Sequence, residues 1–498
     1  MDGDDLPAGW CPAKLDDVFT LHRGVTYRKP DARVSAEDGY LPLLRANNID
    51  QVVNFDDLVF VPEGLVSDDQ RLQPFDIIIA MSSGSKRLVG KAAQIKKPCD
   101  ATFGAFCAVA RPSETMEPAF VGWFMQTREY RQSVSDDSKG SNINNLKRDH
   151  VLGVPFRVPP LPEQQRIVEK IETLFAELDK GEEALREVQK LLARYRQSVL
   201  KAAVTGTLTA DWRAANGPHK ETGKDLLARI LEERRATWQG RGNYPEPVEP
   251  KIDGLPALPT GWSWASVDQV SNEMLIGLVR AASLQNTAGD GAPYIKMDRI
   301  DMYGHLGIDT DVFVDVSNDE LERFALVEGD VLFNTRNSLE LVGKVGIVRK
   351  KPSKPTVYNN NLMRLRFVAS VMPAFLNLQM ASPIFRKKLE LVKRATTSVA
   401  AVYGKDLKAL PIAVPPIDEQ QEIIDRTDLA LAKIRHALNL CDVEMKRSAA
   451  LRQSILKDAF AGKLVPQDPS DEPAEKLLER IRATRAEKPK AKRKKANA

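Results

Sequence analysis

The sequence predicts an α+β fold built twice, in which two globules of mixed helix and strand alternate with two long helices packed as an antiparallel coiled coil. Three observations predict it. The segments that begin at Pro159-Pro160 and Pro415-Pro416 repeat each other at one constant offset as far as Gly206 and Gly462. Apolar residues within both segments recur with heptad spacing. Short β-branched runs bounded by turn residues precede each segment. The chain is therefore an internal, pseudo-twofold duplication.

Each long helix is expected to start just after its proline pair, because proline is not tolerated in a helix interior. Gly206 and Gly462 are the expected stops. The core-facing series of the first helix is Ile167, Ile171, Leu174, Leu178, Gly181, Leu185, Val188, Leu192, Tyr195 and Val199. That of the second is Ile424, Thr427, Leu431, Ile434, Leu438, Cys441, Met445, Ser448, Arg452 and Ile455. A helix of about forty residues is ~60 Å long and cannot bury its own stripe, which favours pairing of the copies. Two separate helices, each lying on its own globule, are the alternative.

The globules are predicted from short strands and one amphipathic stretch each. The expected strands are 58–61, 77–80 and 107–110 in the first globule, and 312–316, 331–334 and 362–368 in the second. The expected helical stretches are 118–134 and 373–392. The predicted domains are a first globule (1–158), a first helical region (159–238), a Pro- and Gly-rich linker (239–257), a second globule (258–414), a second helical region (415–486) and a basic disordered tail (487–498).

Composition restricts the class of protein. The 498 residues carry a formal net charge of +4, and the basic tail beyond Lys488 accounts for the excess. No apolar run approaches the ~18 residues that span a bilayer, and the N-terminus is acidic. The four cysteines form no C-x-x-C pair, which indicates a reducing cytoplasm and predicts no metal site. We expect a cytoplasmic protein.

Motifs for catalysis are missing from the sequence. Gly90-Lys91, Gly343-Lys344 and Gly462-Lys463 lack the following Ser or Thr of a phosphate loop. There is no G-x-G-x-x-G, no Asn/Asp-Pro-Pro-aromatic methyltransferase motif and no cluster among the five histidines. We therefore expect no catalytic residue and no cofactor in this chain.

Polar side chains near strand ends are the candidate functional residues. Asn and Gln pair bidentately with adenine and Arg with guanine in the major groove, and Ser, Thr and Lys suit phosphates as well. Asn and Ser are also common in ordinary turns, so for any single residue the alternative to a DNA contact is a structural role in a turn. The collective argument is that corresponding positions carry different polar residues in the two copies, as expected if each copy reads a different sequence. The candidates are Arg45, Asn47, Asn48, Ser82, Ser83, Ser85, Lys86, Arg87, Asn142, Asn144, Asn145, Lys147, Lys296, Arg299, Asn334, Thr335, Arg336, Asn337, Asn359 and Asn360.

Nearly the whole chain resembles one known family, the specificity subunits of type I restriction–modification systems. The resemblance rests on the paired P-P-L/I-x-E-Q-Q segments at 159–165 and 415–421 and on R-Q-S-[VI]-L-K at 196–201 and 452–457. The L-P-x-G-W openings at 6–10 and 258–262 agree with it, as do the strands at 75–79 and 329–333. Phe75 departs from the pattern, since a glycine is typical there.

The resemblance implies that the globules are target recognition domains, that the long helices are helical spacer regions, and that the subunit is not catalytic. It implies a bipartite, asymmetric double-stranded DNA target with a nonspecific gap. The implied partners are two methyltransferase subunits and two restriction subunits, which hold S-adenosylmethionine, ATP and Mg²⁺. It places the partner surface on the helices as a region, around Glu163, Gln164, Gln165, Arg166, Glu419, Gln420 and Gln421. Helix capping by first-turn carboxylates is the alternative for these positions.

Two other functions remain open from the residues alone. A scaffold whose globules bind protein or glycan fits a duplicated rod equally well. The other is a fused enzyme with an unrecognised catalytic domain, for which methyl transfer by the isolated chain would be the evidence.

Overall fold

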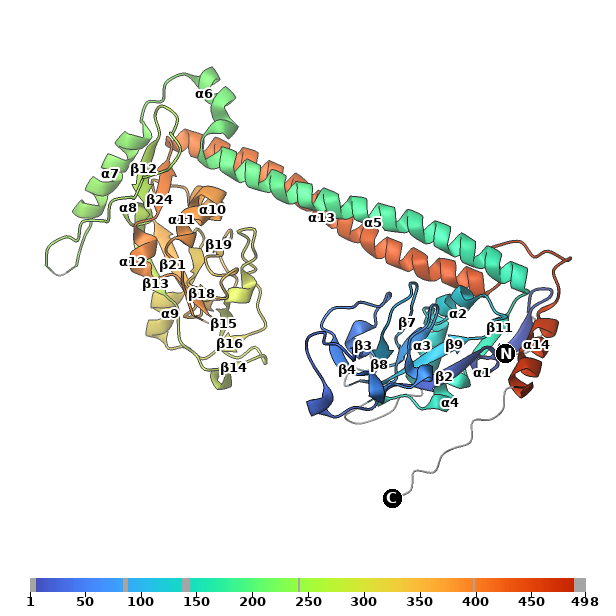
Figure 1. Cartoon of the computed structure of the whole chain (residues 1–498). Helices are drawn as coiled ribbons and strands as arrows, with labels where there is room; N and C mark the ends of the chain where they lie inside the picture. The colour runs from blue at the N-terminus through green and yellow to red at the C-terminus, as the bar shows by residue number, and fades with distance from the viewer. Residues whose placement is uncertain (1–5, 84–87, 137–143, 241, 397–398, 488–498) are drawn as a thin grey trace. The chain divides into compact units, whose positions relative to one another are not determined.

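The computed structural model describes residues 6–83, 88–136, 144–240, 242–396 and 399–487 (Figure 1). The chain divides into two compact units. Unit 1 contains Met1–Leu185 and Asp442–Ala498, and unit 2 contains Arg186–Cys441. Each unit thus takes one globule and one part of each long helix. None of the described helices is both long and apolar enough to cross a membrane.

The long helices are α5 (Leu161–Val204) and α13 (Ile417–Phe460), each of 44 residues. Both begin directly after their proline pairs, as predicted. Both end shortly before the predicted glycine, and Gly206 and Gly462 adopt left-handed φ values of 70° and 68°. Glycine reaches this conformation without a Cβ penalty, which explains why the helices end there.

The two helices pack in opposite senses within each unit, which confirms the predicted antiparallel pair. In unit 1 the beginning of α5, at Ile167 and Ile171, shares a core with the end of α13, at Ile455 and Leu456. Ser448 Oγ also donates to Glu182 Oε1 at 2.7 Å. In unit 2 the relation is reversed. The apolar residues that meet there are Leu200 and Ala203 of α5 and Ile423 and Ile424 of α13.

The predicted heptad series is correct for α13 and partly wrong for α5. Every position of the α13 series is buried or half-buried. In α5, Gly181, Val188 and Tyr195 are exposed instead. The residues that follow them, Glu182, Gln189 and Arg196, are half-buried or buried, so the covered face of α5 includes polar and charged residues there, which an apolar pattern does not mark.

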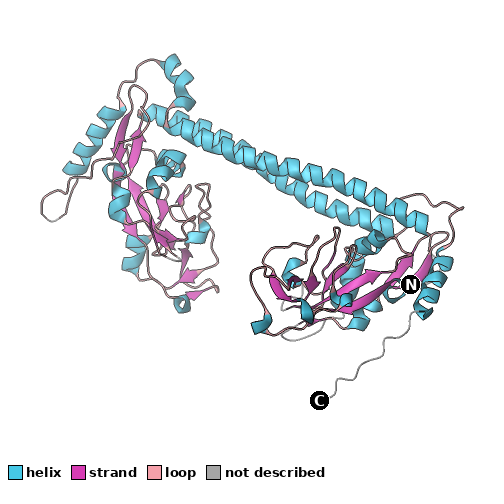
Figure 2. Ribbon diagram, viewed as in Figure 1, coloured by secondary structure: helices cyan, strands magenta, loops and turns pink. Residues whose placement is uncertain are grey.

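Unit 1 is organised on a four-stranded antiparallel sheet with the order β2-β9-β5-β7. A second sheet has the order β4-β3-β8, and two short pairs, β1-β11 and β6-β10, complete the strands (Figure 2). The strands are β1 (Cys11–Lys14), β2 (Phe19–Arg23), β3 (Tyr40–Leu44), β4 (Val59–Pro62), β5 (Ile77–Ala80), β6 (Ser82–Ser83), β7 (Ala92–Gln94), β8 (Thr102–Phe103), β9 (Cys107–Pro112), β10 (Asn144–Asn145) and β11 (Pro155–Val158). The helices are α1 (Leu15–Val18), α2 (Pro118–Phe124), α3 (Arg128–Asp136), α4 (Arg148–Leu152) and α14 (Ala474–Glu487), with 3₁₀ turns η2 (Lys29–Asp31), η3 (Ala46–Asn48), η4 (Glu63–Leu65) and η5 (Asp68–Gln70).

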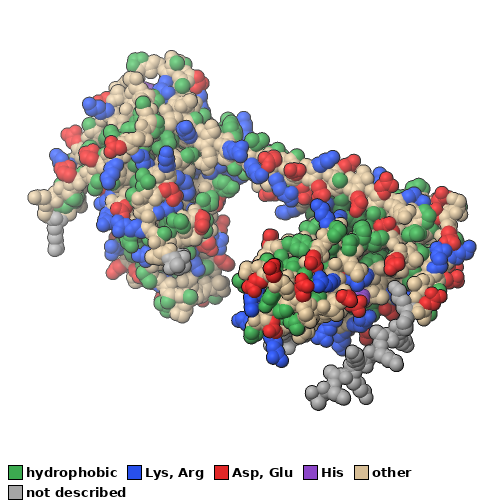
Figure 3. All heavy atoms as spheres, viewed as in Figure 1, with side chains coloured by type: hydrophobic (Ala, Val, Ile, Leu, Met, Phe, Trp, Pro, Cys, Tyr) green, Lys and Arg blue, Asp and Glu red, His purple; other side chains and the backbone are tan. Residues whose placement is uncertain are grey.

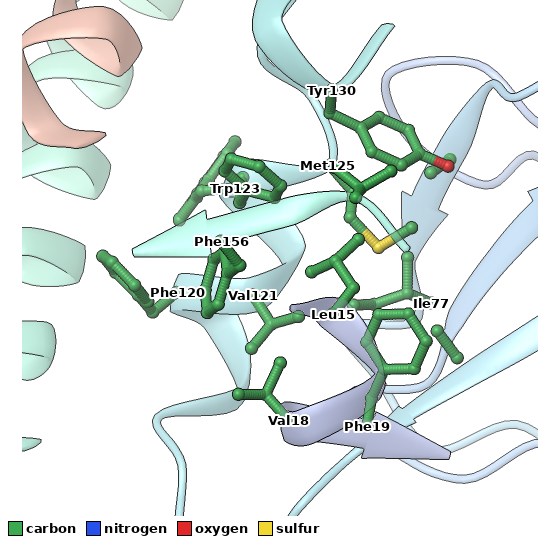
Figure 4. Packing of buried hydrophobic residues seen from close by; sticks show 14 of the residues in the cluster. Leu15, Val18, Phe19, Ile77, Phe120, Val121, Trp123, Met125, Tyr130 and Phe156 are labelled. Carbon is green, nitrogen blue, oxygen red and sulfur yellow. The ribbon is translucent and has the colours of Figure 1, made fainter. Parts of the chain in front are cut away.

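The main core of unit 1 lies between its large sheet, its helices and the helix pair. Figure 4 shows Phe19 and Ile77 beside Leu15 and Met125 in this core, with Phe156 close by. Leu477, Leu478 and Ile481 of α14 are buried in the same cluster, although α14 follows α13 in sequence. The C-terminal helix therefore completes the first globule.

Unit 2 repeats this organisation. Its four-stranded sheet has the order β13-β21-β17-β19, beside a sheet β14-β16-β15-β20, a pair β12-β24 and a small sheet β18-β23-β22. The strands are β12 (Ser263–Ser266), β13 (Ser271–Ile276), β14 (Gln285–Asn286), β15 (Ala292–Ile295), β16 (Phe313–Val314), β17 (Val331–Asn334), β18 (Arg336–Asn337), β19 (Val345–Ile347), β20 (Val357–Tyr358), β21 (Leu362–Phe367), β22 (Arg394–Ala395), β23 (Ala400–Ala401) and β24 (Pro411–Val414). The helices are α6 (Ala210–Asn216), α7 (Gly223–Ala236), α8 (Val267–Val270), α9 (Asn318–Phe324), α10 (Pro373–Ala381), α11 (Pro383–Glu390) and α12 (Gly404–Lys408), with η6 (Thr207–Thr209), η7 (Ala282–Leu284) and η8 (Met297–Arg299).

The predicted strands all exist, and β5 and β17 have the predicted bounds. Each predicted amphipathic stretch is two helices rather than one. In unit 2 the break falls at Ser382, whose side chain accepts a hydrogen bond from Phe385 N and caps the helix that starts at Pro383. In unit 1, Thr127 Oγ1 accepts from Tyr130 N at 3.1 Å between the two helices. A side chain that caps a new helix ends the previous one.

Candidate nucleic-acid interface

In unit 1 the polar residues gather around a cleft of about 840 Å³. Three predicted residues line it: Arg45, which follows β3, Asn47 in η3 and Ser82 in β6. Among the described residues that line this cleft there is no Asp or Glu, while Lys29, Arg33 and Arg45 are basic. Arg33 and Arg45 have carboxylate partners outside the lining, Glu37 at 3.6 Å and Asp57 at 3.0 Å, so hydrogen-bonding side chains rather than net charge suit this cleft to DNA.

Two loops that line this cleft pack closely against each other at Val25 and Gly104. Val25 forms a parallel bridge with Gly104. A Cβ on Gly24 would lie 2.2 Å from Gly104 O, so only glycine allows this approach. Unit 2 has the same arrangement, in which Leu278 bridges Asn359 and a Cβ on Gly277 would lie 2.3 Å from Tyr358 O.

Phe106 is a cleft residue that sequence reasoning missed. Its side chain is 70% exposed, although its backbone carbonyl accepts hydrogen bonds from Met81 N and Ser82 N. Phe106 lines the cleft, and an exposed aromatic ring can stack on a nucleic-acid base. The signal in the sequence was an aromatic residue in a turn directly after Gly104-Ala105. Asn361 occupies the corresponding place in unit 2, since its carbonyl accepts from Thr335 N at 2.8 Å.

Four predicted DNA contacts are wrong, because their side chains are buried in hydrogen bonds or packing within the chain. They are Asn48, Asn334, Thr335 and Asn359. Asn48 Nδ2 donates to Asp56 O at 2.7 Å, and Asn334 Nδ2 donates to Asn361 O at 3.1 Å. Asn and Thr in such turns satisfy backbone groups, which is the structural role that their residue type also favours.

Other predicted contacts are accessible. Asn47, Asn145, Lys147 and Arg336 are exposed, and Arg45, Ser82, Lys296, Arg299, Asn337 and Asn360 are half-buried. Two of the arginines already have carboxylate partners, because Arg45 pairs with Asp57 at 3.0 Å and Arg299 with Asp311 at 2.7 Å. The strand pair β6-β10 places the backbone of Ser82 and Ser83 against that of Asn145 and Asn144, so two predicted segments do meet. Ser85, Lys86, Arg87 and Asn142 lie outside the described residues.

Charge alone does not mark this interface. Figure 3 shows Lys and Arg side chains mixed with Asp and Glu over the visible faces of both globules and the helices. The cleft in unit 1 is distinguished instead by the strand ends that converge on it.

Four of the predicted partner-surface residues are likewise corrected. Glu163, Gln164, Glu419 and Gln420 are buried. Glu163 accepts from Trp10 Nε1 at 3.1 Å, and Glu419 accepts from Trp262 Nε1 at 2.8 Å. The E-Q pair and the L-P-x-G-W tryptophan therefore form one internal clamp in each unit. Burial raises the pKa of Glu163, whereas Glu419 has the half-buried Arg213 as its ion-pair partner.

The glutamines of the clamp hold the globule against the first turn of the long helix. Gln164 Nε2 donates to Pro159 O at 2.9 Å, and its Oε1 accepts from Glu117 N at 3.0 Å. Gln420 repeats both contacts with Pro415 O and Met372 N. Of the remaining predicted partner residues, Gln165 and Gln421 are exposed, and Arg166 pairs with Asp471 at 2.7 Å.

Comparison with known proteins defines the class. The family model of the type I restriction modification DNA specificity domain matches residues 7–187. The sequence is 35% identical to the type I restriction enzyme EcoKI specificity subunit of Escherichia coli (strain K12), over 98% of this chain and 97% of that protein. It is 31% identical to the StySPI specificity subunit of Salmonella potsdam, over 98% of this chain and 97% of that protein.

A solved structure agrees on the fold. It comes from work on complex assembly and conformational transition of the type I R-M system, and its matching chain has a TM-score of 0.60 at 20% identity. The match covers 92% of this chain and 99% of that one. The chain therefore belongs to the specificity subunits of type I restriction enzymes, as the resemblance predicted.

Proposed function

We propose that this chain recognises a bipartite, asymmetric DNA target, one half with each globule, and has no active site of its own. The observation that carries the proposal is that the two units have equivalent strands and loops but carry different side chains at equivalent positions. Phe106 and Asn361 occupy equivalent positions, directly before β9 in unit 1 and β21 in unit 2, yet one side chain is aromatic and the other is an amide. The loops after β3 and β15 likewise carry Arg45 and Lys296. Different side chains on equal frames would read different base edges.

The partners in this proposal are two methyltransferase subunits, joined by two restriction subunits in the full complex. They hold S-adenosylmethionine, ATP and Mg²⁺, and this chain supplies the sequence preference. The long helices are the proposed docking region. Gln165 and Gln421, the fifth residue of each helix, are exposed, so these two remain candidates whereas their buried neighbours do not.

A map of modified adenines tests the proposal. Genomic DNA is compared between cells that carry this chain with its methyltransferase partner and cells that lack only this chain. A split motif that disappears with the chain supports the proposal and gives both half-sites and the gap. Equal maps, with the complex shown to be intact, would overturn it and favour a scaffold that binds protein or glycan. Salt-dependent binding of duplex DNA by the complex is the second readout.

A further inference from the structure

The lysine of L-V-G-K occurs at the same place in both units. Lys91 and Lys344 each follow a glycine whose N–H bonds to the last residue of a central strand. Gly90 N donates to Ala80 O at 2.7 Å, and Gly343 N donates to Asn334 O at 2.8 Å. Both lysine side chains therefore start from equivalent points beside the loop that follows β3 or β15.

In unit 2 this lysine is buried beneath the candidate reading loop. Lys344 Nζ donates to Met297 O at 3.0 Å and to Ile300 O at 2.5 Å. Both carbonyls belong to the loop 296–301, which carries Lys296 and Arg299. Burial lowers the pKa of Lys344, and Asp298 and Asp301 act in the opposite direction. A buried ammonium needs its acceptors, so the lysine and the loop fix each other.

The same loop is fixed from its other end by helix α5. Asp301 Oδ1 accepts from Tyr303 N at 2.7 Å and from His305 N at 3.0 Å, which shapes the turn after the loop. Arg196 of the R-Q-S motif is buried, donates to Tyr303 O at 2.5 Å and lies 4.5 Å over the Tyr303 ring. Contacts thus run from α5 through Tyr303 and Asp301 to the loop.

We propose that Lys344 and Arg196 are positioning residues for DNA recognition: they fix the loop 296–301 on the frame of unit 2, so that its side chains meet one set of base edges. The inference rests on the proposed function. Neither residue reads a base, since both are buried. In unit 1 the equivalent Lys91 forms an ion pair of 2.8 Å with Asp50, whose side chain is 70% exposed, so it holds its loop more weakly.

The test uses the full chain in complex with its methyltransferase subunits. Methyl transfer is measured on the cognate duplex and on duplexes with one base changed in the first or in the second half-site. Wild type must prefer the cognate duplex over both, and failure here would count against the proposed function rather than against positioning. For Lys344→Met we expect discrimination at the half-site read by unit 2 to fall about tenfold, the order that one base contact carries. Discrimination at the other half-site should stay unchanged.

Lys91→Met is the matched control: because its ion pair is exposed, its effect on discrimination should be smaller than that of Lys344→Met and confined to the other half-site. Tyr303→Ala removes the ring beneath Arg196 and leaves Lys344 in place, and it should act in the same direction as Lys344→Met. Because Tyr303 is exposed, this variant decides the question if Lys344→Met does not fold. Equal loss of methylation on all duplexes, or unchanged discrimination in a folded complex, would overturn the inference.

Discussion

Replacing Glu419 by Gln tests the internal clamp, and the structure sets the magnitude. The carboxylate is fully buried and accepts hydrogen bonds from Trp262 Nε1 at 2.8 Å, from Thr209 Oγ1 at 2.6 Å and from the Arg213 guanidinium. Glutamine has one acceptor oxygen, so its amide NH₂ must face one of these donors. A hydrogen bond to a charged group is worth about 1.5–3 kcal/mol. We expect the free energy of unfolding of unit 2 to fall by about 2–3 kcal/mol.

Glu163→Gln is the matched control at the same position of the repeat. Glu163 accepts from Trp10 Nε1 with both oxygens at 3.1 Å and from Gln467 with Oε1, and both donors are neutral. A glutamine oxygen at the Oε1 position keeps one bond to each donor, and the amide NH₂ replaces only the second contact to Trp10. Burial raises the pKa of Glu163, so the native state binds its proton more readily than the unfolded chain. Above the ordinary pKa of glutamate this opposes folding, and well below it the effect is absent. Glu163→Gln should therefore raise stability slightly at neutral pH, and the gain should shrink as the pH falls toward that ordinary pKa.

Thermal unfolding of the full chain at neutral pH measures both variants. At about 2–4 °C per kcal/mol, Glu419→Gln should lower the Tm of the transition that contains unit 2 by roughly 4–12 °C. Glu163→Gln should not lower the Tm of unit 1. Equal decreases in both variants would refute the assignment of different charge environments to the two clamps, and an unchanged Tm for Glu419→Gln would refute the stabilising role of its ion pair.

Three further predictions concern the end of α13, the long helices as the element that sets the gap between half-sites, and the reading of one half-site by each globule. Gly462→Ala should destabilise unit 1 by about 1–3 kcal/mol, because its Cβ would lie 2.3 Å from Pro7 Cγ. Gly39→Ala is the control, since Gly39 has a similar positive φ with open space around it. The difference between the denaturant midpoints of the two variants measures the cost of the clash. Adding one heptad to each of α5 and α13 lengthens the helices by about 10 Å and should widen the gap between half-sites by about three base pairs. A methylation map with an unchanged gap would show that the length of the helices does not set the distance between half-sites. Exchanging residues 262–410 for those of another specificity subunit should change one half of the motif in the same map, and a change in both halves would contradict modular reading.

Local sequence signals predicted the bounds of helices well where a proline or a glycine restricts or allows a particular backbone conformation. Proline pairs marked the starts of α5 and α13, and glycines marked their ends. Phe75 stands where the family pattern typically has a glycine, and its φ of 67° lies in the left-handed region that glycine favours. The corresponding Gly329 has a φ of 89°, so the backbone keeps the turn where the side chain does not favour it.

The candidate site was harder to predict, because residue type does not distinguish a base contact from a turn. Asn47 and Asn48 are neighbours of the same type, yet Asn47 is exposed at the cleft and Asn48 is buried in the loop. Phe106 was missed for the opposite reason, since an aromatic residue between strands is normally part of a core. Asn48 is turned inward by Asn54 and Asp56 of its own loop, which residue type alone does not reveal, whereas Phe106 is fixed by Met81 and Ser82, which are distant in sequence.

The duplication, the extent of the long helices and the family follow from breakers and motifs that repeat within one chain, whereas the pairing of the helices was one of two alternatives until the packing was known. What the motif residues do depends on the tertiary structure. Glu163 and Glu419 occupy corresponding positions of the repeat, but one meets neutral donors and the other meets Arg213. Lys91 and Lys344 belong to the same L-V-G-K, but one pairs with a carboxylate at the surface and the other is buried under two carbonyls. The physical reason is that burial and charge partners come from long-range packing, which a local pattern does not encode.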